Sequence, residues 1–240
     1  MEEICKKFNN KKVPSNVFIN NWINEKEIYP LEQNHPKIVA FKEKYNLKDK
    51  FIIMYSGNIG LYYDLENIIK VIGEFKDRED VVFAFIGDGT VKSKIEEYVV
   101  ENKLNNVTFI PYQDKADLIY SLNAADIHWV VNAKGIKGVS VPSKLYGVMA
   151  AGKPVLGVLD EGSEARLIVE ECNCGVCIEP GNYKEISRNI EYILNNKEHI
   201  RSLGQNGRKY LEVNLTKDVS INKYKETILS LDNQTELITN

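Results

Sequence analysis

The sequence predicts an α/β fold in which a doubly wound parallel sheet carries helices on both faces. Short apolar runs of strand length alternate along the chain with segments of helical period. The apolar runs are unbroken, which indicates strands buried on both faces, as in a parallel sheet covered by helices. Alternating strands and helices with right-handed crossovers then give the doubly wound arrangement.

Six apolar runs are predicted to be strands, and a seventh short run at residues 17–19 is counted as a further candidate. No internal repeat or low-complexity linker interrupts them. The six strands are expected at residues 51–55, 81–86, 107–110, 127–131, 154–158 and 175–178.

The helices are predicted from the spacing of apolar residues and from signals at their ends. Asp64 is a candidate N-cap for a helix whose apolar face recurs through residues 65–75. A shorter helical face follows at residues 118–125. Pro142 opens the next helix, because the N–H that proline lacks would be unpaired there anyway, and Gly152 ends it. Further helices are expected at residues 182–212, where two fit, and from about residue 216.

Composition and charge limit the classes of protein to which this chain can belong. The chain has 240 residues, of which 43% are hydrophobic and 27% charged, the profile of an ordinary globular protein. A formal net charge of -3 and a pI of about 5.8 argue against an electrostatic nucleic-acid binder. The densest basic stretch is typical of a solvated surface, with an anionic membrane as the alternative. It holds Lys6, Lys7, Lys11 and Lys12.

Targeting signals are not apparent in the sequence. No apolar run is long enough to span a bilayer, and the first residues lack the basic start and apolar core of a signal peptide. The expected location is therefore the cytoplasm, with attachment to the inner face of the cell membrane through a partner as an option.

Three cysteines cluster at Cys172, Cys174 and Cys177 and raise the question of a zinc site. Structural zinc takes four ligands, and neither a fourth cysteine nor a histidine lies nearby in the sequence. The cysteines are better interpreted as small apolar residues around a turn and a buried strand. His128, inside an apolar run, is likewise interpreted as a strand histidine rather than an acid–base group. We expect no metal and no cofactor.

Two of the predicted strands are followed by glycine-containing loops, and ligands of such sheets bind at the carboxyl ends of the strands. In the first loop, Gly57, Asn58 and Gly60 allow backbone N–H groups to approach a phosphate closely. This loop lacks the ending of a Walker loop and the third glycine of a dinucleotide fingerprint. The second loop, with Gly87 and Gly89, is by itself a common turn.

A third loop, residues 139–144, leads into a predicted helix. A helix N-terminus offers unpaired N–H groups and partial positive charge, and Ser143 and Lys144 lie in the first turn. Lys144 opposes the helix dipole unless an anion binds nearby. Three such loops on one sheet predict a phosphorylated, nucleotide-type ligand.

Five segments follow one another in a recognisable order along the chain. They are residues 54–60, 85–89, 107–112, 125–128 and 141–156. Together they resemble the C-terminal domain of family-four retaining glycosyltransferases, in the branch that makes bacterial capsule, exopolysaccharide or O-antigen sugars. The resemblance extends from about Pro14 to about Leu231, and its specificity lies in the ordered series.

The resemblance implies one half of the two-domain GT-B architecture, a Rossmann-like domain that binds the nucleotide sugar. Residues 20–24 resemble a segment just past the family's domain junction. Residues 1–32 are therefore expected to lead in from that junction, and residues 33–240 to form the donor-binding domain with its C-terminal helices. The N-terminal acceptor domain would then be absent and be supplied by a separate domain or protein.

The resemblance also implies the chemistry. The family transfers a sugar from a nucleoside diphosphate to a lipid-linked or saccharide acceptor, with retention at the anomeric carbon and without a metal. Backbone N–H groups and basic side chains stabilise the leaving diphosphate. By family habit the donor is a UDP-sugar, and no nucleic acid partner is expected.

Site residues are assigned by position in the resemblance. They are Gly57, Asn58 and Gly60 in the first phosphate-side loop, Gly87 and Gly89 beside the donor cleft, Pro111 and Tyr112 at the nucleobase, and Ser143 and Lys144 at the diphosphate helix.

The sequence departs from the family pattern at charged positions. Many members have an Arg and a Lys after the first loop glycine, where this chain has Asn58 and Tyr63. Many have two glutamates around the diphosphate helix, where this chain has Val139 and Gly147. The phosphate role, and with it the catalytic role, is therefore assigned to Lys144.

Three assignments near the site stay open. Glu164 is the candidate for the ribose contact, with a helix N-terminal acid as the stronger interpretation. Tyr62 and Tyr63 either line a sugar pocket or pack at a helix start.

Functions other than sugar transfer are also considered. The chain could be a non-catalytic nucleotide-sugar-binding fragment, since catalysis needs both walls of the cleft. A nucleotide-sugar epimerase-like domain would need a carboxylate and histidine set that we do not find. A response-regulator domain would need clustered aspartates after the first strand.

Overall fold

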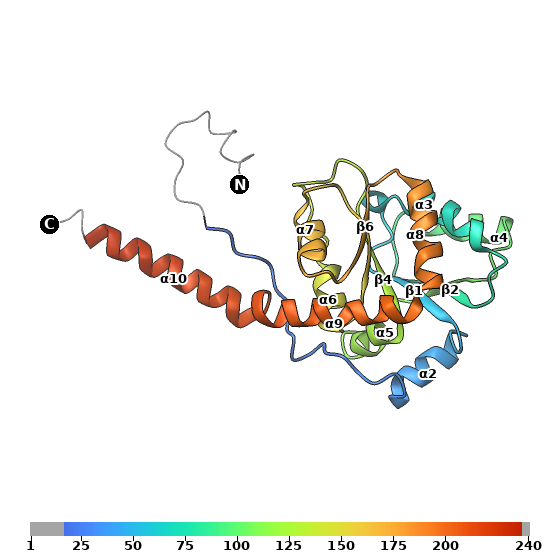
Figure 1. Ribbon diagram of the computed structural model, residues 1–240, viewed down its shortest axis with the longest axis horizontal. Coiled ribbons are helices and arrows are strands. Elements are labelled where there is room, and N and C mark those ends of the chain that lie inside the picture. Colours follow the sequence, from blue (N-terminus) through green and yellow to red (C-terminus); the bar gives the residue numbers. More distant parts are fainter. Residues whose placement is uncertain (1–16, 237–240) are drawn as a thin grey trace.

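The computed structural model describes residues 17–236 and contains a six-stranded, all-parallel sheet in the order β3-β2-β1-β4-β5-β6 (Figure 1). The strand order reverses between β1 and β4, so the carboxyl ends of these two strands form the switch point of a doubly wound sheet. The strands are β1 (Phe51–Ser56), β2 (Val81–Ile86), β3 (Val107–Ile110), β4 (Ile127–Val131), β5 (Val155–Val158) and β6 (Gly175–Ile178).

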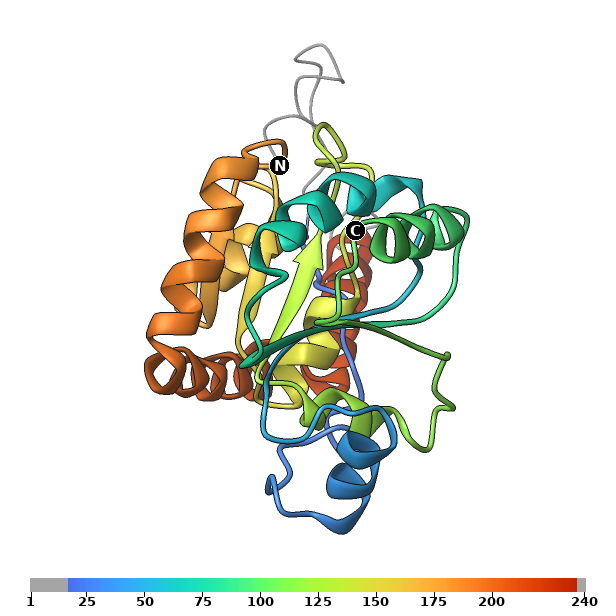
Figure 2. The same cartoon turned by 90° about the vertical axis from the view of Figure 1, so that its right-hand side faces the viewer.

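Helices cover both faces of the sheet (Figure 2). One core cluster joins the sheet to α3, α4 and α8, and two others join it to α2, α5, α6 and α7. The helices are α2 (Pro36–Lys44), α3 (Leu65–Ile72), α4 (Lys92–Glu101), α5 (Leu118–Ala124), α6 (Lys144–Ala150), α7 (Glu164–Glu171), α8 (Tyr183–Asn195), α9 (Lys197–Asn214) and α10 (Lys217–Glu236), with the short 3-10 helices η1 (Leu61–Tyr63) and η2 (Gly73–Phe75). In Figure 1, α10 projects away from the sheet.

Burial on both faces explains the unbroken apolar strands. In β1, Phe51, Ile53 and Tyr55 pack into the cluster with α3, while Ile52 and Met54 pack into the cluster with α2. All five side chains are at most 2% exposed. The predicted doubly wound α/β fold is therefore confirmed.

The seventh strand predicted at residues 17–19 is wrong. These residues pair with no strand of the sheet, and Val17 and Phe18 are each 56% exposed. An isolated parallel bridge joins Ile23 to Thr216 instead. A short run of strand-forming residues has no neighbouring strand to pair with here, and propensity alone does not make a strand.

Asp64 precedes α3 as predicted, but it does not cap the helix through its side chain. The backbone of Asp64 is in the left-handed conformation, with φ of 52°, and its carboxylate accepts hydrogen bonds from the Asn67 side-chain amide (2.6 Å) and the Tyr183 hydroxyl (2.8 Å). Its backbone carbonyl accepts the first helical bonds from Asn67 and Ile68.

The two ends predicted for α6 are close to those observed. The helix begins at Lys144, and the Leu145 N–H donates to the Pro142 carbonyl at 3.0 Å, so Pro142 belongs to the first turn. Gly152, with φ of 64°, donates its N–H to Met149 and terminates the helix.

The basic stretch from Lys6 to Lys12 lies outside the described residues. Within the described part of the chain, no helix combines the length and the hydrophobicity that a membrane span requires.

Candidate functional site

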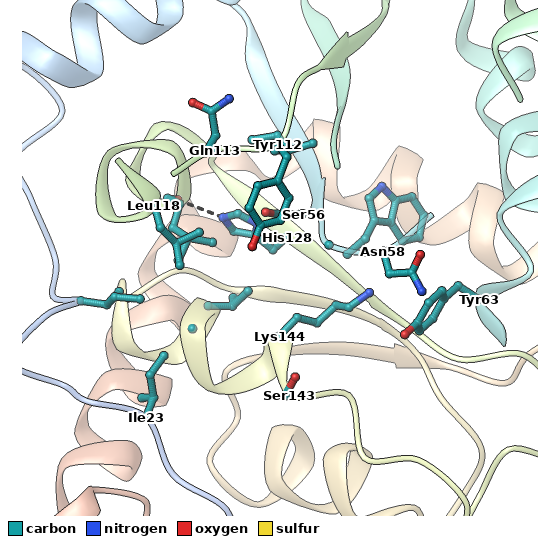
Figure 3. A pocket seen from close by; sticks show the side chains of 17 residues that line it. Ile23, Ser56, Asn58, Tyr63, Tyr112, Gln113, Leu118, His128, Ser143 and Lys144 are labelled. Atoms are coloured by element: carbon teal, nitrogen blue, oxygen red, sulfur yellow. Dashed lines mark hydrogen bonds between the residues drawn. The ribbon is translucent and has the colours of Figure 1, made fainter. Parts of the chain in front are cut away.

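A pocket of about 380 Å³ opens at the switch point of the sheet (Figure 3). Its wall combines the loops after β1 and β3, parts of α5 and β4, and the first turn of α6. Ile23 and Ile28 close it from the segment before α2. The fold thus brings together loops that are about 90 residues apart in the sequence, as the pattern of glycines after the strands predicts.

Lys144 reaches into this pocket from the start of α6, toward Asn58 and Tyr63 (Figure 3). Its ammonium donates a hydrogen bond to the Tyr55 hydroxyl at 2.6 Å. It lies 3.9 Å from the centre of the Tyr55 ring and 4.1 Å from that of Tyr63. Burial lowers the pKa of Lys144 to about 7, and no described carboxylate lies within salt-bridge distance to oppose this.

The loop after β1 lies against the Lys144 side chain. A Cβ atom on Gly57, which has φ of 145°, would stand 3.5 Å from the Lys144 Cε. The Asn58 carbonyl accepts a hydrogen bond from the Tyr55 hydroxyl at 2.5 Å. Among the described residues, the backbone N–H groups of Asn58, Gly60 and Ser143 donate to no backbone carbonyl.

Gly87 and Gly89 lie beneath that loop rather than in the pocket wall. A Cβ on Gly87 would stand 2.0 Å from the Gly57 carbonyl oxygen, and one on Gly89 would stand 2.3 Å from that of Ile59. Both have positive φ, 133° and 157°. Their position indicates that they let the second loop pack directly on the first.

The other predicted residues divide between the wall and its surroundings. Tyr112 lines the pocket at its rim and is 78% exposed, and Ser143 lines it beside Lys144. Pro111 does not line the pocket, but its carbonyl accepts a hydrogen bond from the Gln113 side chain at 2.6 Å. Gly60 does not line the pocket, and a Cβ on it would stand 3.1 Å from the Asn58 side-chain nitrogen.

Glu164 lies in a separate pocket of about 180 Å³ between the loop before α6 and the start of α7. It is the first residue of α7, the position of a helix N-terminal acid. Its carboxylate accepts hydrogen bonds from Asn20 (3.3 Å) and from the Tyr146 hydroxyl (3.4 Å). The structure does not bring Glu164 into the wall of the larger pocket.

His128 is a structural residue, as the sequence indicates. It is 1% exposed, and its Nε2 atom is 2.9 Å from the Leu122 carbonyl oxygen, as the dashed line in Figure 3 marks. That oxygen can only accept, so Nε2 carries the proton. Burial lowers the pKa of His128 to about 4, so the ring is neutral at physiological pH.

The three described cysteines, Cys172, Cys174 and Cys177, are free thiols. Cys174 is buried, and burial raises the pKa of Cys177 to about 12, which keeps its thiol protonated. Over residues 17–236, no three His, Cys, Asp or Glu side chains gather closely enough to hold a metal ion. The interpretation of the cysteines as packing residues fits this environment.

Three residues of the site were not found from the sequence. Tyr55, whose hydroxyl accepts a hydrogen bond from Lys144, lies in an apolar run that predicts only a buried strand. Gln113 belongs to no recognisable motif. Trp129 lines the pocket, and its indole N–H has no hydrogen-bond partner among the described residues. Of the two tyrosines left open, Tyr63 lines the pocket and Tyr62 is 64% exposed.

Comparison with known proteins finds relatives that are named as glycosyltransferases. The "Probable glycosyltransferase WbjE" of Pseudomonas aeruginosa is 30% identical over 221 residues, which are 92% of this chain and 54% of WbjE. The structure of Anabaena Alr3699/HepE in complex with UDP-glucose superposes with a TM-score of 0.72 at 14% identity, over 90% of this chain and 57% of HepE. This chain therefore spans about half the length of such relatives.

A solved domain matches over nearly all of its own length. The C-terminal domain of the glycosyl transferase group 1 family protein LpcC from Francisella tularensis has a TM-score of 0.67 at 20% identity, over 81% of this chain and 99% of that domain. These neighbours establish the Rossmann-like fold of GT-B glycosyltransferases. Residues 38–210 match the family described as "Glycosyl transferases group 1". The chain belongs to the group 1 glycosyl transferase family.

Proposed function

We propose that the switch-point pocket binds the diphosphate of a nucleoside diphosphate sugar, and that this chain is the donor-binding domain of a retaining glycosyltransferase. The observation that carries the proposal is the Lys144 ammonium. It lines the switch-point pocket, between two aromatic rings, without a carboxylate among the described residues to neutralise it.

An ammonium removed from water without a counter-charge is unfavourable, and its lowered pKa expresses that cost. A diphosphate beside it would restore a counter-charge. The same anion would accept hydrogen bonds from the backbone N–H groups of Asn58 and Ser143, which line the pocket and have no backbone acceptor within residues 17–236. A lysine and convergent N–H groups form the donor set that phosphates prefer.

This arrangement suits sugar transfer. Negative charge grows on the diphosphate as its bond to the anomeric carbon breaks, and a fixed ammonium stabilises that charge without a metal. Lys144 would therefore be the catalytic residue of this domain. The acceptor, a lipid-linked or saccharide hydroxyl, would be held by a second domain or protein.

The proposal extends to the base of the donor, which we take to be uracil, and to the class of acceptor. HepE is crystallised with UDP-glucose, and the LpcC match is a C-terminal domain, which supports a UDP-sugar donor and a C-terminal position for this chain. The ordered motifs of the sequence support a role in surface polysaccharide synthesis. We assign the nucleoside contact to Tyr112 and Gln113, which line the pocket in the loop after β3.

The test is calorimetric titration of the chain with UDP and then with GDP, for the wild type and two lysine variants. Lys144→Ala removes the proposed diphosphate contact. Lys153→Ala is a matched control, because burial also lowers the pKa of that lysine, to about 8, yet Lys153 lines a different pocket beside Pro154.

We expect saturable binding of UDP that Lys144→Ala weakens about tenfold or more, the effect of one charge-assisted contact, and that Lys153→Ala leaves unchanged. Equal affinities in both folded variants would remove Lys144 from the site. Release of sugar from UDP-sugar by the chain, with or without an added acceptor domain, separates an enzyme domain from a non-catalytic binding fragment.

A further inference from the structure

We propose that Tyr55 is a positioning residue of the donor site, whose hydroxyl holds the Lys144 ammonium in place and links it to the loop after β1. The proposal rests on the proposed function of Lys144, and it assigns a second residue to the same site. Tyr55 lies at the carboxyl end of β1, where the strand gives way to the loop that contains Gly57.

The direction of each hydrogen bond follows from the groups involved. A phenol has one proton, and the Asn58 carbonyl, 2.5 Å from the Tyr55 oxygen, can only accept it. The oxygen of Tyr55 is then left to accept, and the Lys144 ammonium donates to it at 2.6 Å. Burial raises the pKa of Tyr55, so its proton remains in place at every physiological pH.

The resulting chain of bonds runs from the loop through Tyr55 to Lys144. It ties the first turn of α6 to the backbone of Asn58, although the two are 86 residues apart in the sequence. The rings of Tyr55 and Tyr63 flank the ammonium at 3.9 and 4.1 Å, which limits its other positions. A long, flexible side chain is thereby fixed before a ligand arrives, which lowers the entropy that binding must remove.

The surroundings of Lys144 make the Tyr55 hydroxyl its principal polar partner. The titratable groups that face the ammonium are Tyr55 from β1 and Tyr63 from η1, and burial is the cause of its lowered pKa. Within the described residues, the Tyr63 hydroxyl makes no hydrogen bond, unlike that of Tyr55. Tyr63→Phe is therefore a matched control for Tyr55→Phe, since each loses one hydroxyl and keeps its ring.

The first measurement needs no ligand. Trace acetylation of the wild type across pH 6–10, read by mass spectrometry of the Lys144 peptide, gives the pKa of that amine. Tyr55→Phe removes the acceptor of the ammonium and should lower this pKa by about one unit, because hydrogen bonding to the charged form favours it. Tyr63→Phe should leave it unchanged.

The second measurement is UDP affinity at pH 6 and pH 8. We expect Tyr55→Phe to weaken binding about fivefold at pH 6, where Lys144 keeps its proton, and more at pH 8, where fewer Lys144 side chains are charged. A purely structural role for Tyr55 would lower the melting temperature equally at both pH values and would move neither the Lys144 pKa nor the UDP affinity. That result would overturn the proposal.

The experiment also separates this proposal from the proposed function. If the wild type binds no UDP, the donor-site assignment fails, while the acetylation profile still tests whether Tyr55 holds Lys144. If Tyr55→Phe does not fold, 3,5-difluorotyrosine at position 55 keeps the hydroxyl and makes it a weaker acceptor. It should shift the Lys144 pKa downward, and an unchanged value would contradict the role of Tyr55.

Discussion

Replacing Gly87 by alanine tests whether the two glycine loops pack as closely as the structure indicates. Gly87 has φ of 133°, a conformation that side chains rarely adopt, and its added Cβ would stand 2.0 Å from the Gly57 carbonyl oxygen. Real Cβ atoms essentially never come within 3.0 Å of such an atom, so one loop must move by about 1 Å.

The magnitude follows from two contributions. The strained backbone costs about 1–3 kcal/mol, and the enforced contact adds about 1–3 kcal/mol. A loss of about 3 kcal/mol lowers the melting temperature of a domain of this size by roughly 6–12 °C. The displaced loop carries Asn58, so UDP affinity should fall as well.

The control is Gly135→Ala. Gly135 also has positive φ, 84°, but its Cβ would meet nothing within 4 Å. This variant should lose about 1 kcal/mol from backbone strain alone. Both variants are followed by thermal unfolding with circular dichroism. If Gly87→Ala loses no more stability than Gly135→Ala, the close packing of the two loops is refuted.

Two further predictions concern stability. Since His128 is neutral in the folded chain, with a pKa of about 4 against about 6.5 when unfolded, the unfolded chain binds more protons below pH 6.5. Stability should fall by about 2 kcal/mol from pH 7.5 to pH 5 in urea unfolding, and His128→Gln should remove most of that slope; an equal slope would exclude His128 as its source. Arg208→Ala removes hydrogen bonds to the carbonyls of Ile28 (3.0 Å) and Ala150 (2.9 Å) and should cost about 2–3 kcal/mol in the same assay, whereas a loss under 0.5 kcal/mol would show that these bonds do not anchor the segment before α2.

Much of the fold could be predicted because the burial of a strand on both faces is visible in the sequence as an unbroken apolar run. The strands of a sheet covered on both faces must be apolar throughout, so the six runs, β1 among them, were identifiable. The seventh was wrong because residues 17–19 carry strand-forming side chains without a neighbouring ladder, a fact that only the tertiary structure supplies. Asp64 failed as a side-chain cap because Tyr183, 119 residues away, and Asn67 compete for its carboxylate.

The candidate site was predictable only in part. Glycine loops and a lysine at a helix start are visible in the sequence, and the structure places Gly57, Asn58, Ser143 and Lys144 around one pocket. Tyr55 could not be found in this way, because a tyrosine in a buried strand looks like any core residue until the partner of its hydroxyl is known.

The most direct test of the donor-site assignment is a crystal structure of this chain with UDP. We predict that the diphosphate lies within hydrogen-bonding distance of the Lys144 ammonium and of backbone N–H groups in the loop after β1. A diphosphate bound elsewhere, with Lys144 still bonded to Tyr55 alone, would contradict the assignment.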